Sequence, residues 1–272
     1  MKIDVDQVLR SRLPRHYRYM PRFVVRWLER IICQDKLNAI LQHMAGKNGV
    51  DAATAALHEM GITVNATGLE QLPQGRFLFV SNHPLGGLDG LALISLLGNR
   101  YDRHIKFLVN DLLMAVEPLR DVFLPVNKYG SQSRDAASRI EQALKSDDQF
   151  ITFPAGLCSR MQSDGSIADL VWHKAAVVHA AAHHRDIVPV YFDARNSSFF
   201  YRFAKWRKHL GIKFNIELVL LPREMVKQSN STLRVVIGQP LAWDSLDAAR
   251  PRQEAARLRD IVYSMAKESS KP

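Results

Sequence analysis

A histidine and an aspartate, His83 and Asp89, lie in one short stretch, SNHPLGGLDG, with five residues between them. A neutral imidazole can accept a proton near physiological pH, and a carboxylate on its second nitrogen would fix the tautomer and stabilise the imidazolium that forms. Residues at this spacing do not share a face of a regular helix, so a turn has to bring them together. Pro84, Gly86 and Gly87 permit such a turn. The stretch therefore predicts a general-base site.

Other interpretations of the same stretch have to be weighed. Its glycines would let backbone N–H groups approach a phosphate, but the orders GxGxxG and GK[ST] are absent. Ser81 stands outside any GxSxG elbow, which argues against a nucleophilic serine. An ordinary histidine at a strand end, followed by an aspartate that caps the next helix, is the alternative that the residues leave open.

The elements around the stretch alternate between strands and helices. Apolar runs predict buried strands at 76–80, 104–109, 121–126, 149–153, 186–192, 214–221 and 232–238. Helical spacing predicts helices at 89–98, 133–146, 171–184 and 252–267. We therefore predict an α/β domain over residues 61–272, with a largely parallel central sheet flanked by helices. Ligands of such sheets bind beyond the carboxyl ends of the strands, where the stretch with His83 lies.

The first 60 residues predict helices alone. Apolar residues at helical spacing extend from residue 22 to a glycine at Gly46, which is a suitable end, and a second helix fits 51–61. This N-terminal helical segment, 1–60, could be a separate cap that faces a membrane or part of an outer helical layer. The sequence leaves both possibilities open.

The composition is that of a basic globular protein. Its 272 residues are 47% hydrophobic, and 37 Lys and Arg against 27 Asp and Glu give a formal net charge of +10. A polyanion is therefore an expected partner: nucleic acid, anionic lipid or an acidic carrier. No RRM, KH, helix-turn-helix or zinc-finger pattern is visible, so we do not expect nucleic acid.

Three features indicate a cytoplasmic protein with peripheral membrane contact at most. The two cysteines, Cys33 and Cys158, are far apart, which suits a reducing compartment. The N-terminus lacks the apolar core of an export signal. The longest apolar runs are well short of the ~20 residues that a membrane-spanning helix needs.

Four blocks in order resemble the glycerolipid acyltransferase superfamily. NHPLGGLDG resembles the family's first motif, NHxxxxD, with one residue more between His83 and Asp89, and FLPVNK, FPAGLCSR and IVPVYF resemble the next three blocks. The resemblance covers residues 76–192, and four ordered blocks are more specific than one short pattern. It implies a glycerol-3-phosphate acyltransferase-like fold and no cofactor. It also implies that His83 is the general base, that Asp89 orients it, and that no acyl-enzyme forms.

The substrates and their site follow from the same resemblance. The donor would be an acyl thioester of acyl carrier protein or coenzyme A, and the acceptor a lysolipid hydroxyl. The implied substrate-binding residues are Asn82, Gly86, Gly87, Asn127, Lys128, Pro154, Gly156, Ser159 and Arg160. Backbone N–H groups of the three glycines are candidates for stabilising the oxyanion. An acyl-thioester hydrolase and a nonenzymatic lipid-binding protein are the alternatives.

Departures from the family pattern fall in the blocks that help to bind the acceptor's phosphate. Ala155 stands where Glu is usual, Cys158 where Arg is usual, and Arg160 is displaced by two positions. Asn127 and Lys128 replace the usual Asp and Arg. The variant is similar to a hemolysin-like branch whose members O-acylate lyso-aminolipids to complete ornithine or glycine lipids. Such acceptors lack a phosphate, although Lys128 and Arg160 could still hold one between them.

Two stretches, 10–30 and 198–214, combine basic and aromatic residues. A solvated basic face over an amphipathic helix would explain either. The alternative is a surface that lies on anionic lipid at the inner face of the cell membrane, with Arg and Lys reaching the head groups. The aromatic residues expected at that interface are Trp27, Phe199, Phe200, Phe203 and Trp206.

Three histidines close together, His179, His183 and His184, raise the question of a metal. The first two are four residues apart, as metal ligands on one helical face can be. A single cluster with no acid on the same helix is more typical of a surface group. We therefore predict no metal site.

Overall fold

The computed structural model describes residues 2–12, 14–126, 134–212 and 214–266. Within them, seven strands form one sheet in the order β1-β9-β8-β2-β5-β3-β4, and β6 and β7 form a separate antiparallel pair. In the seven-stranded sheet neighbouring strands run parallel, except β8 and β9, which are antiparallel. The strands are β1 Thr63–Thr67, β2 Phe77–Ser81, β3 Ile105–Asn110, β4 Phe123–Val126, β5 Gln149–Thr152, β6 Arg160–Met161, β7 Ile167–Ala168, β8 Asp186–Asp193 and β9 Thr232–Ile237. The predicted largely parallel sheet is confirmed.

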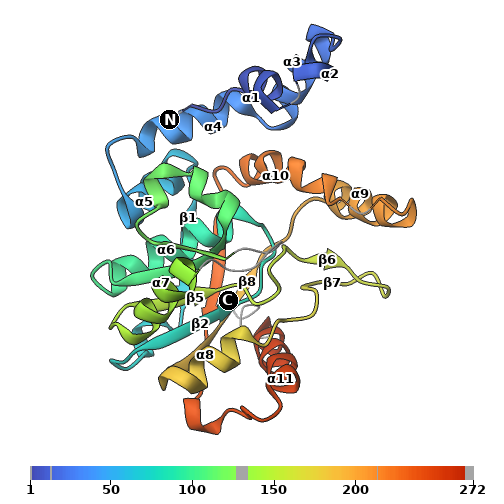
Figure 1. Cartoon of the computed structure of the whole chain (residues 1–272). Coiled ribbons are helices and arrows are strands. Elements are labelled where there is room, and N and C mark those ends of the chain that lie inside the picture. The colour runs from blue at the N-terminus through green and yellow to red at the C-terminus, as the bar shows by residue number, and fades with distance from the viewer. Residues whose placement is uncertain (1, 13, 127–133, 213, 267–272) are drawn as a thin grey trace.

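Helices cover both faces of this sheet (Figure 1). They are α1 Val5–Arg12, α2 Pro14–Tyr17, α3 Arg22–Ile31, α4 Gln34–Met44, α5 Gly49–Glu59, α6 Gly87–Arg100, α7 Arg134–Lys145, α8 Ala175–His183, α9 Ser198–His209, α10 Leu221–Lys227 and α11 Pro251–Ser264. Alternate residues of β2 face opposite layers, as the pleat of a strand requires. Phe77 and Phe79 pack in the core that includes α5 and α6, whereas Leu78 and Val80 pack with α7, α8 and α11.

The predicted helix over 22–46 is two helices. α3 ends at Ile31 and α4 begins at Gln34, because Cys33 adopts a left-handed conformation with φ 54°. Only glycine and, less often, asparagine or aspartate adopt this conformation readily, so a cysteine gives no warning of the break. Beyond it, Ile40 and Met44 of α4 belong to the same core as the sheet.

The strand predicted at 214–221 is wrong. Residues Ile216–Leu220 form a short 3₁₀-helix, η4, which continues into α10. Glu217 lies inside this apolar run and is fully buried between two arginines, so the segment packs against α9 instead of joining the sheet. β1 was not predicted, because its short polar sequence TVNAT alternates only between exposed and half-buried positions at the sheet edge.

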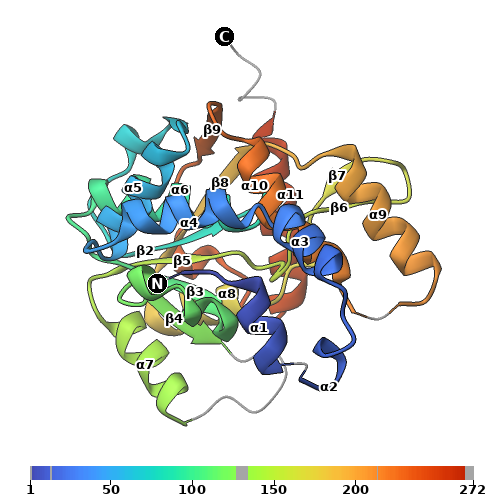
Figure 2. The same cartoon turned by 90° about the horizontal axis from the view of Figure 1, so that it is seen from above.

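Several aromatic side chains of α3 and α9 are exposed or only partly buried. In both views α3 runs near α9 and α10 (Figure 2), and Ile31 at its end packs against the cluster that includes Tyr201 and Leu220. We call these side chains together the aromatic face: Phe23, Trp27, Phe199 and Trp206 are exposed, and Phe203 is partly buried. The expectation that Phe200 joins it is wrong, because Phe200 is on the inner side of α9 and is completely buried.

Among the described residues, no helix is both long and apolar enough to cross a bilayer.

Candidate active site

The stretch with His83 begins where β2 ends, and Asn82 fixes that end. Its side-chain Nδ2 donates to the carbonyl oxygen of Phe192 (3.0 Å), and its Oδ1 accepts from the Phe192 N–H (2.7 Å). Asn82 is only 3% exposed. The amide thus ties the end of β2 to β8 and sets the position of the next residue, His83, beyond the carboxyl edge of the sheet.

His83 and Asp89 are in contact. His83 Nδ1 lies 3.0 Å from Asp89 Oδ2, and the same oxygen accepts the backbone N–H groups of Leu85 (2.9 Å) and Gly86 (3.1 Å). Gly86 makes the turn with φ 88°, where a side chain would be strained and would press on Leu221. The turn accommodates the additional residue of the motif. Asp89 is not the N-cap of α6, which is Gly86, but from the third helical position its carboxylate also accepts the Gly86 N–H and so stabilises the start of the helix.

The surroundings give the two side chains different properties. Asp89 is completely buried, and this burial raises the pKa of its carboxyl group above the ordinary value. The His83 side chain is 17% exposed, and its ring stacks on Phe153 with centroids 4.0 Å apart. Because Asp89 Oδ2 already accepts two N–H bonds, it favours Nδ1 of His83 as the protonated nitrogen. Nε2 is then the nitrogen that can accept a proton from a ligand.

The third block lies against the first. The Ser159 N–H donates to the carbonyl oxygen of His83 (2.7 Å). Before it the chain turns at Gly156, which has φ 63°, and the carbonyl oxygen of Pro154 accepts the N–H of His173 (2.9 Å). The structure therefore brings Pro154, Gly156 and Ser159 into one loop beside His83, as β2 and β5 are adjacent strands.

A buried carboxylate that the sequence did not indicate joins the two loops. Asp169 Oδ1 accepts the backbone N–H of His83 (3.1 Å) and the hydroxyl of Ser159 (2.7 Å), and its Oδ2 accepts the indole N–H of Trp172 (2.9 Å). The N–H of Asp169 itself donates to the hydroxyl oxygen of Tyr263 on α11 (2.7 Å). Asp169 is 1% exposed. No motif marks it, since its partner His83 is 86 residues away in sequence.

The guanidinium group of Arg160 forms its hydrogen bonds with other groups of the protein. Its Nη1 donates to the carbonyl oxygens of Cys158 (2.7 Å) and Ser159 (3.2 Å), and its Nη2 donates to Glu217 Oε1 (2.9 Å). Its guanidinium also lies over the ring of Phe200 at 5.4 Å. Asn127 and Lys128, the other expected contacts of an acceptor, lie outside the described residues.

The three glycines suggested for the oxyanion differ in their backbone N–H groups. The N–H of Gly86 donates to Asp89, and that of Gly156 donates to the carbonyl oxygen of Phe153 (2.9 Å). Gly87 occupies the first position of α6, where helical geometry provides no intrahelical acceptor for an N–H group. Its N–H is therefore the best placed of the three to bind a negatively charged oxygen.

The three histidines in and just after α8 lie near other side chains of the protein. His183 Nε2 lies 3.3 Å from Glu141 Oε2, and the ring of His184 stacks on Trp243 with centroids 4.0 Å apart. The rings of His179 and His183 are 6.4 Å apart. In the part of the chain that the structure describes, no group of three His, Cys, Asp or Glu side chains is placed to hold a metal ion.

The chain is similar to known acyltransferases along nearly its whole length. Two proteins named lyso-glycine lipid O-acyltransferase match over 265 residues. That of Bacteroides thetaiotaomicron is 46% identical and covers 97% of both chains; that of Phocaeicola vulgatus is 45% identical and covers 97% of this chain and 95% of its own. The fold matches the 1-acyl-sn-glycerophosphate acyltransferase PlsC of Thermotoga maritima with a TM-score of 0.50 at 16% identity, covering 97% of this chain and 88% of that one. A family model for acyltransferases matches residues 7–269, and the chain therefore belongs to the acyltransferase family.

Proposed function

We propose that the protein transfers a fatty acyl chain from an acyl thioester to the hydroxyl group of a lysolipid, with His83 as general base. The observation that carries this proposal is the contact of His83 Nδ1 with the buried Asp89, which leaves Nε2 for the acceptor. Nε2 takes the hydroxyl proton while the oxygen attacks the thioester carbonyl carbon. The C–S bond then breaks, and the imidazolium returns the proton to the leaving thiolate. No acyl-enzyme is needed.

Two groups favour the charged states along this path. The Asp89 carboxylate stabilises the imidazolium, and the N–H of Gly87, which has no intrahelical acceptor at the start of α6, suits the oxyanion. The thioester belongs to acyl carrier protein or coenzyme A in this proposal. Both carriers are acidic, and the net charge of +10 would attract either.

We infer that the acceptor is a lyso-aminolipid of the glycine-lipid type. The two relatives whose names specify such an acceptor share 45% and 46% of their residues with this chain. In addition, the arginine of the third block is already paired with Glu217, and Ala155 in that block is buried in the core. Neither residue favours a phosphate in the acceptor.

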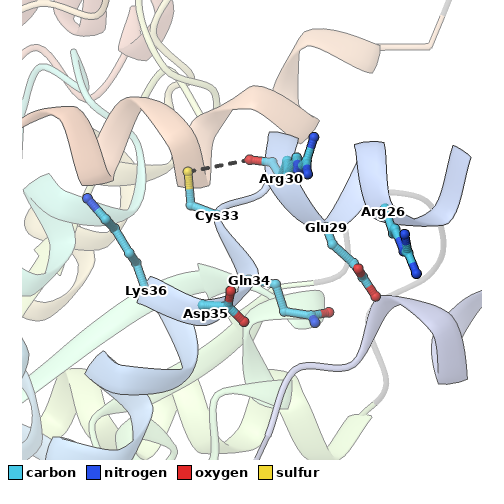
Figure 3. A pocket seen from close by; sticks show the side chains of 7 residues that line it. All are labelled: Arg26, Glu29, Arg30, Cys33, Gln34, Asp35 and Lys36. Carbon is cyan, nitrogen blue, oxygen red and sulfur yellow. Dashed lines mark hydrogen bonds between the residues drawn. The ribbon is translucent and has the colours of Figure 1, made fainter. Parts of the chain in front are cut away.

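The aromatic face suits contact with a membrane surface. Phe23 and Trp27 are 72% and 59% exposed and border a cavity of 550 Å³ together with Arg26 and Arg30. A second cavity of 420 Å³ opens where α3 meets α4; Figure 3 shows Arg26, Arg30 and Lys36 around it together with Glu29 and Asp35. Aromatic side chains with arginines beside them are typical of proteins that lie on anionic lipid. We propose peripheral contact with the inner face of the cell membrane.

The experiment that tests the function is an acceptor panel. The purified protein is incubated with acyl carrier protein and coenzyme A thioesters and with lyso-glycine lipid, lyso-ornithine lipid and lysophosphatidate, and the lipid products are measured. We expect O-acylated product with the lyso-aminolipids. Free fatty acid alone would indicate a hydrolase, and neither product would indicate a binding protein; both results contradict the proposal.

A further inference from the structure

Three charged side chains are buried together beside the third block. Glu217 of η4 is completely buried and accepts from Arg160 Nη2 at 2.9 Å, and its Oε2 lies 2.8 Å from Nε of Arg207 on α9. The side chains of Arg160 and Arg207 are 11% and 10% exposed. Arg207 is anchored further by Nη1, which donates to the carbonyl oxygen of Ile212 (2.6 Å), and by Nη2, which donates to Asn215 Oδ1 (3.0 Å).

The group lies next to the catalytic loop. Arg160 directly follows Ser159, whose N–H holds the carbonyl oxygen of His83 at 2.7 Å. The guanidinium of Arg160 folds back and donates to the carbonyl oxygens of Cys158 and Ser159, so its charge stays over the third-block loop. Ser159 thus connects Arg160 directly to the backbone of His83, the residue that would take the acceptor's proton.

The charge balance of the group distinguishes between acceptors. Two guanidinium groups face one carboxylate, so the ion-paired group carries one positive charge more than it carries negative. A carboxylate head group carries one negative charge. A phosphate monoester carries a charge of about −1.5 to −2 near pH 7 and needs more N–H donors than a carboxylate does. The arginine N–H groups that could supply them are already paired with Glu217.

We propose that Glu217 is a specificity-determining residue, which limits the charge at Arg160 and so favours a lysolipid with a single carboxylate over one with a phosphate monoester. This inference rests on the proposed transfer to a lysolipid. It adds that Glu217 determines which class of lysolipid is accepted. Without Glu217, the same two arginines would form a site with two positive charges and free N–H donors, which suits a phosphate.

The test is Glu217→Gln, which keeps the shape of the side chain and removes its charge. We expect the ratio of kcat/KM for lysophosphatidate to that for lyso-glycine lipid to rise about tenfold or more, a difference of 1.4 kcal/mol. The matched control is Glu224→Gln. Glu224 is equally buried but bonds to Ser197 and Lys227, away from Arg160. It should leave the ratio unchanged, because a purely structural loss lowers both rates together.

A measurement on the wild-type protein keeps the proposal testable if Glu217→Gln does not fold. Millimolar inorganic phosphate should not inhibit transfer to lyso-glycine lipid more than chloride at equal ionic strength. Inhibition specific to phosphate would mean that Arg160 is open to it, and would overturn the role of Glu217. An unchanged ratio in the folded variant would overturn that role and leave the proposed function standing. Absence of transfer to every acceptor by the wild type overturns both.

Discussion

The loop that carries His83 and the aromatic face hold their side chains in opposite ways. In the loop, His83 is fixed through its ring by Asp89 and through its backbone by Asp169 and Ser159. On the aromatic face, Trp27 and Trp206 are 59% and 55% exposed and extend into solvent. Proton transfer requires a fixed direction, whereas contact with a fluid lipid surface requires only exposure and charge. Single substitutions should therefore act strongly in the loop and weakly on the face.

The largest effect is expected from His83→Ala. Loss of a general base lowers the rate typically 10²–10⁴-fold, and we expect the fold to survive because the His83 side chain is only partly buried. The measurement is the acyl-transfer rate with saturating lyso-glycine lipid, with a thermal melt to confirm folding. His183→Ala is the control, since His183 also contacts a carboxylate but lies on α8. Transfer by His83→Ala at the wild-type rate would show that the mechanism is wrong.

Asp89→Asn separates orientation from charge. The amide oxygen can still accept from Leu85, Gly86 and His83, and the NH₂ group takes the place of Oδ1, which has no partner among the described residues. The ring stays in place but loses the charge that stabilises its protonated form. We expect kcat to fall about tenfold or more. Asp148→Asn, next to the exposed His104, should not change kcat. A kcat equal to that of the wild type would limit Asp89 to a structural role.

The stability of Asp89→Asn should change in the opposite direction to its activity. Burial raises the pKa of Asp89, so the folded protein binds this proton more readily than the unfolded chain. The ionised carboxylate then destabilises the fold at pH values above the raised pKa, and this effect disappears below about pH 4, where both states are protonated. Thermal melts should therefore place the variant at or above the wild type at pH 8, with the two converging as pH falls. The measured quantity is the melting temperature of the variant minus that of the wild type. A lower difference at pH 8 than at pH 4 would contradict the expected direction.

A smaller effect is expected from Asp169→Asn, which weakens the hydrogen bonds that hold the backbone of His83 and the side chain of Ser159. The carboxylate accepts three hydrogen bonds, and the amide of asparagine has only one oxygen, so either the bond from Trp172 or the bond from the His83 N–H must be lost. We expect kcat to fall by about tenfold with little change in KM, because Asp169 is only 1% exposed. Adding Trp172→Phe removes the opposing donor and should restore part of kcat. A lower melting temperature with unchanged kcat would mean that Asp169 serves the fold alone.

The sequence predicted the loop that carries His83 better than it predicted the buried carboxylates around this loop. The apolar run at β2 and the order of the four blocks identified the sheet and the contact partners His83 and Asp89, because these signals are local. Asp169 and Glu217 were not predicted, since their contacts join residues 86 and 57 positions apart. The same distant pairing made the strand expected at 214–221 wrong, because the carboxylate in this apolar run binds two arginines that lie elsewhere in the sequence.

The smallest effect on chemistry is expected from the aromatic face. Phe199, Phe203 and Trp206 stack in a row on the outer side of α9, with ring centroids 6.0 Å apart, and Arg202 and Lys205 are exposed between them. Phe199→Ser with Trp206→Ser should weaken sedimentation with anionic vesicles and raise the apparent KM for acceptors in vesicles a few-fold. It should leave kcat with a short-chain, water-soluble acceptor unchanged, because the two substituted side chains are 50% and 55% exposed.

Two observations would break the contrast between the face and the loop. Val178→Ser, at an exposed apolar position on α8, should not affect vesicle binding, so an equal loss there would mean that the binding is unspecific. Binding that does not weaken as salt rises would contradict a contact driven by arginine and lysine, since ionic screening reduces such attraction. A loss of kcat with the soluble acceptor would instead show that α9 acts on the loop through the buried group of Arg207, Glu217 and Arg160, and the face and the loop would then be one functional unit.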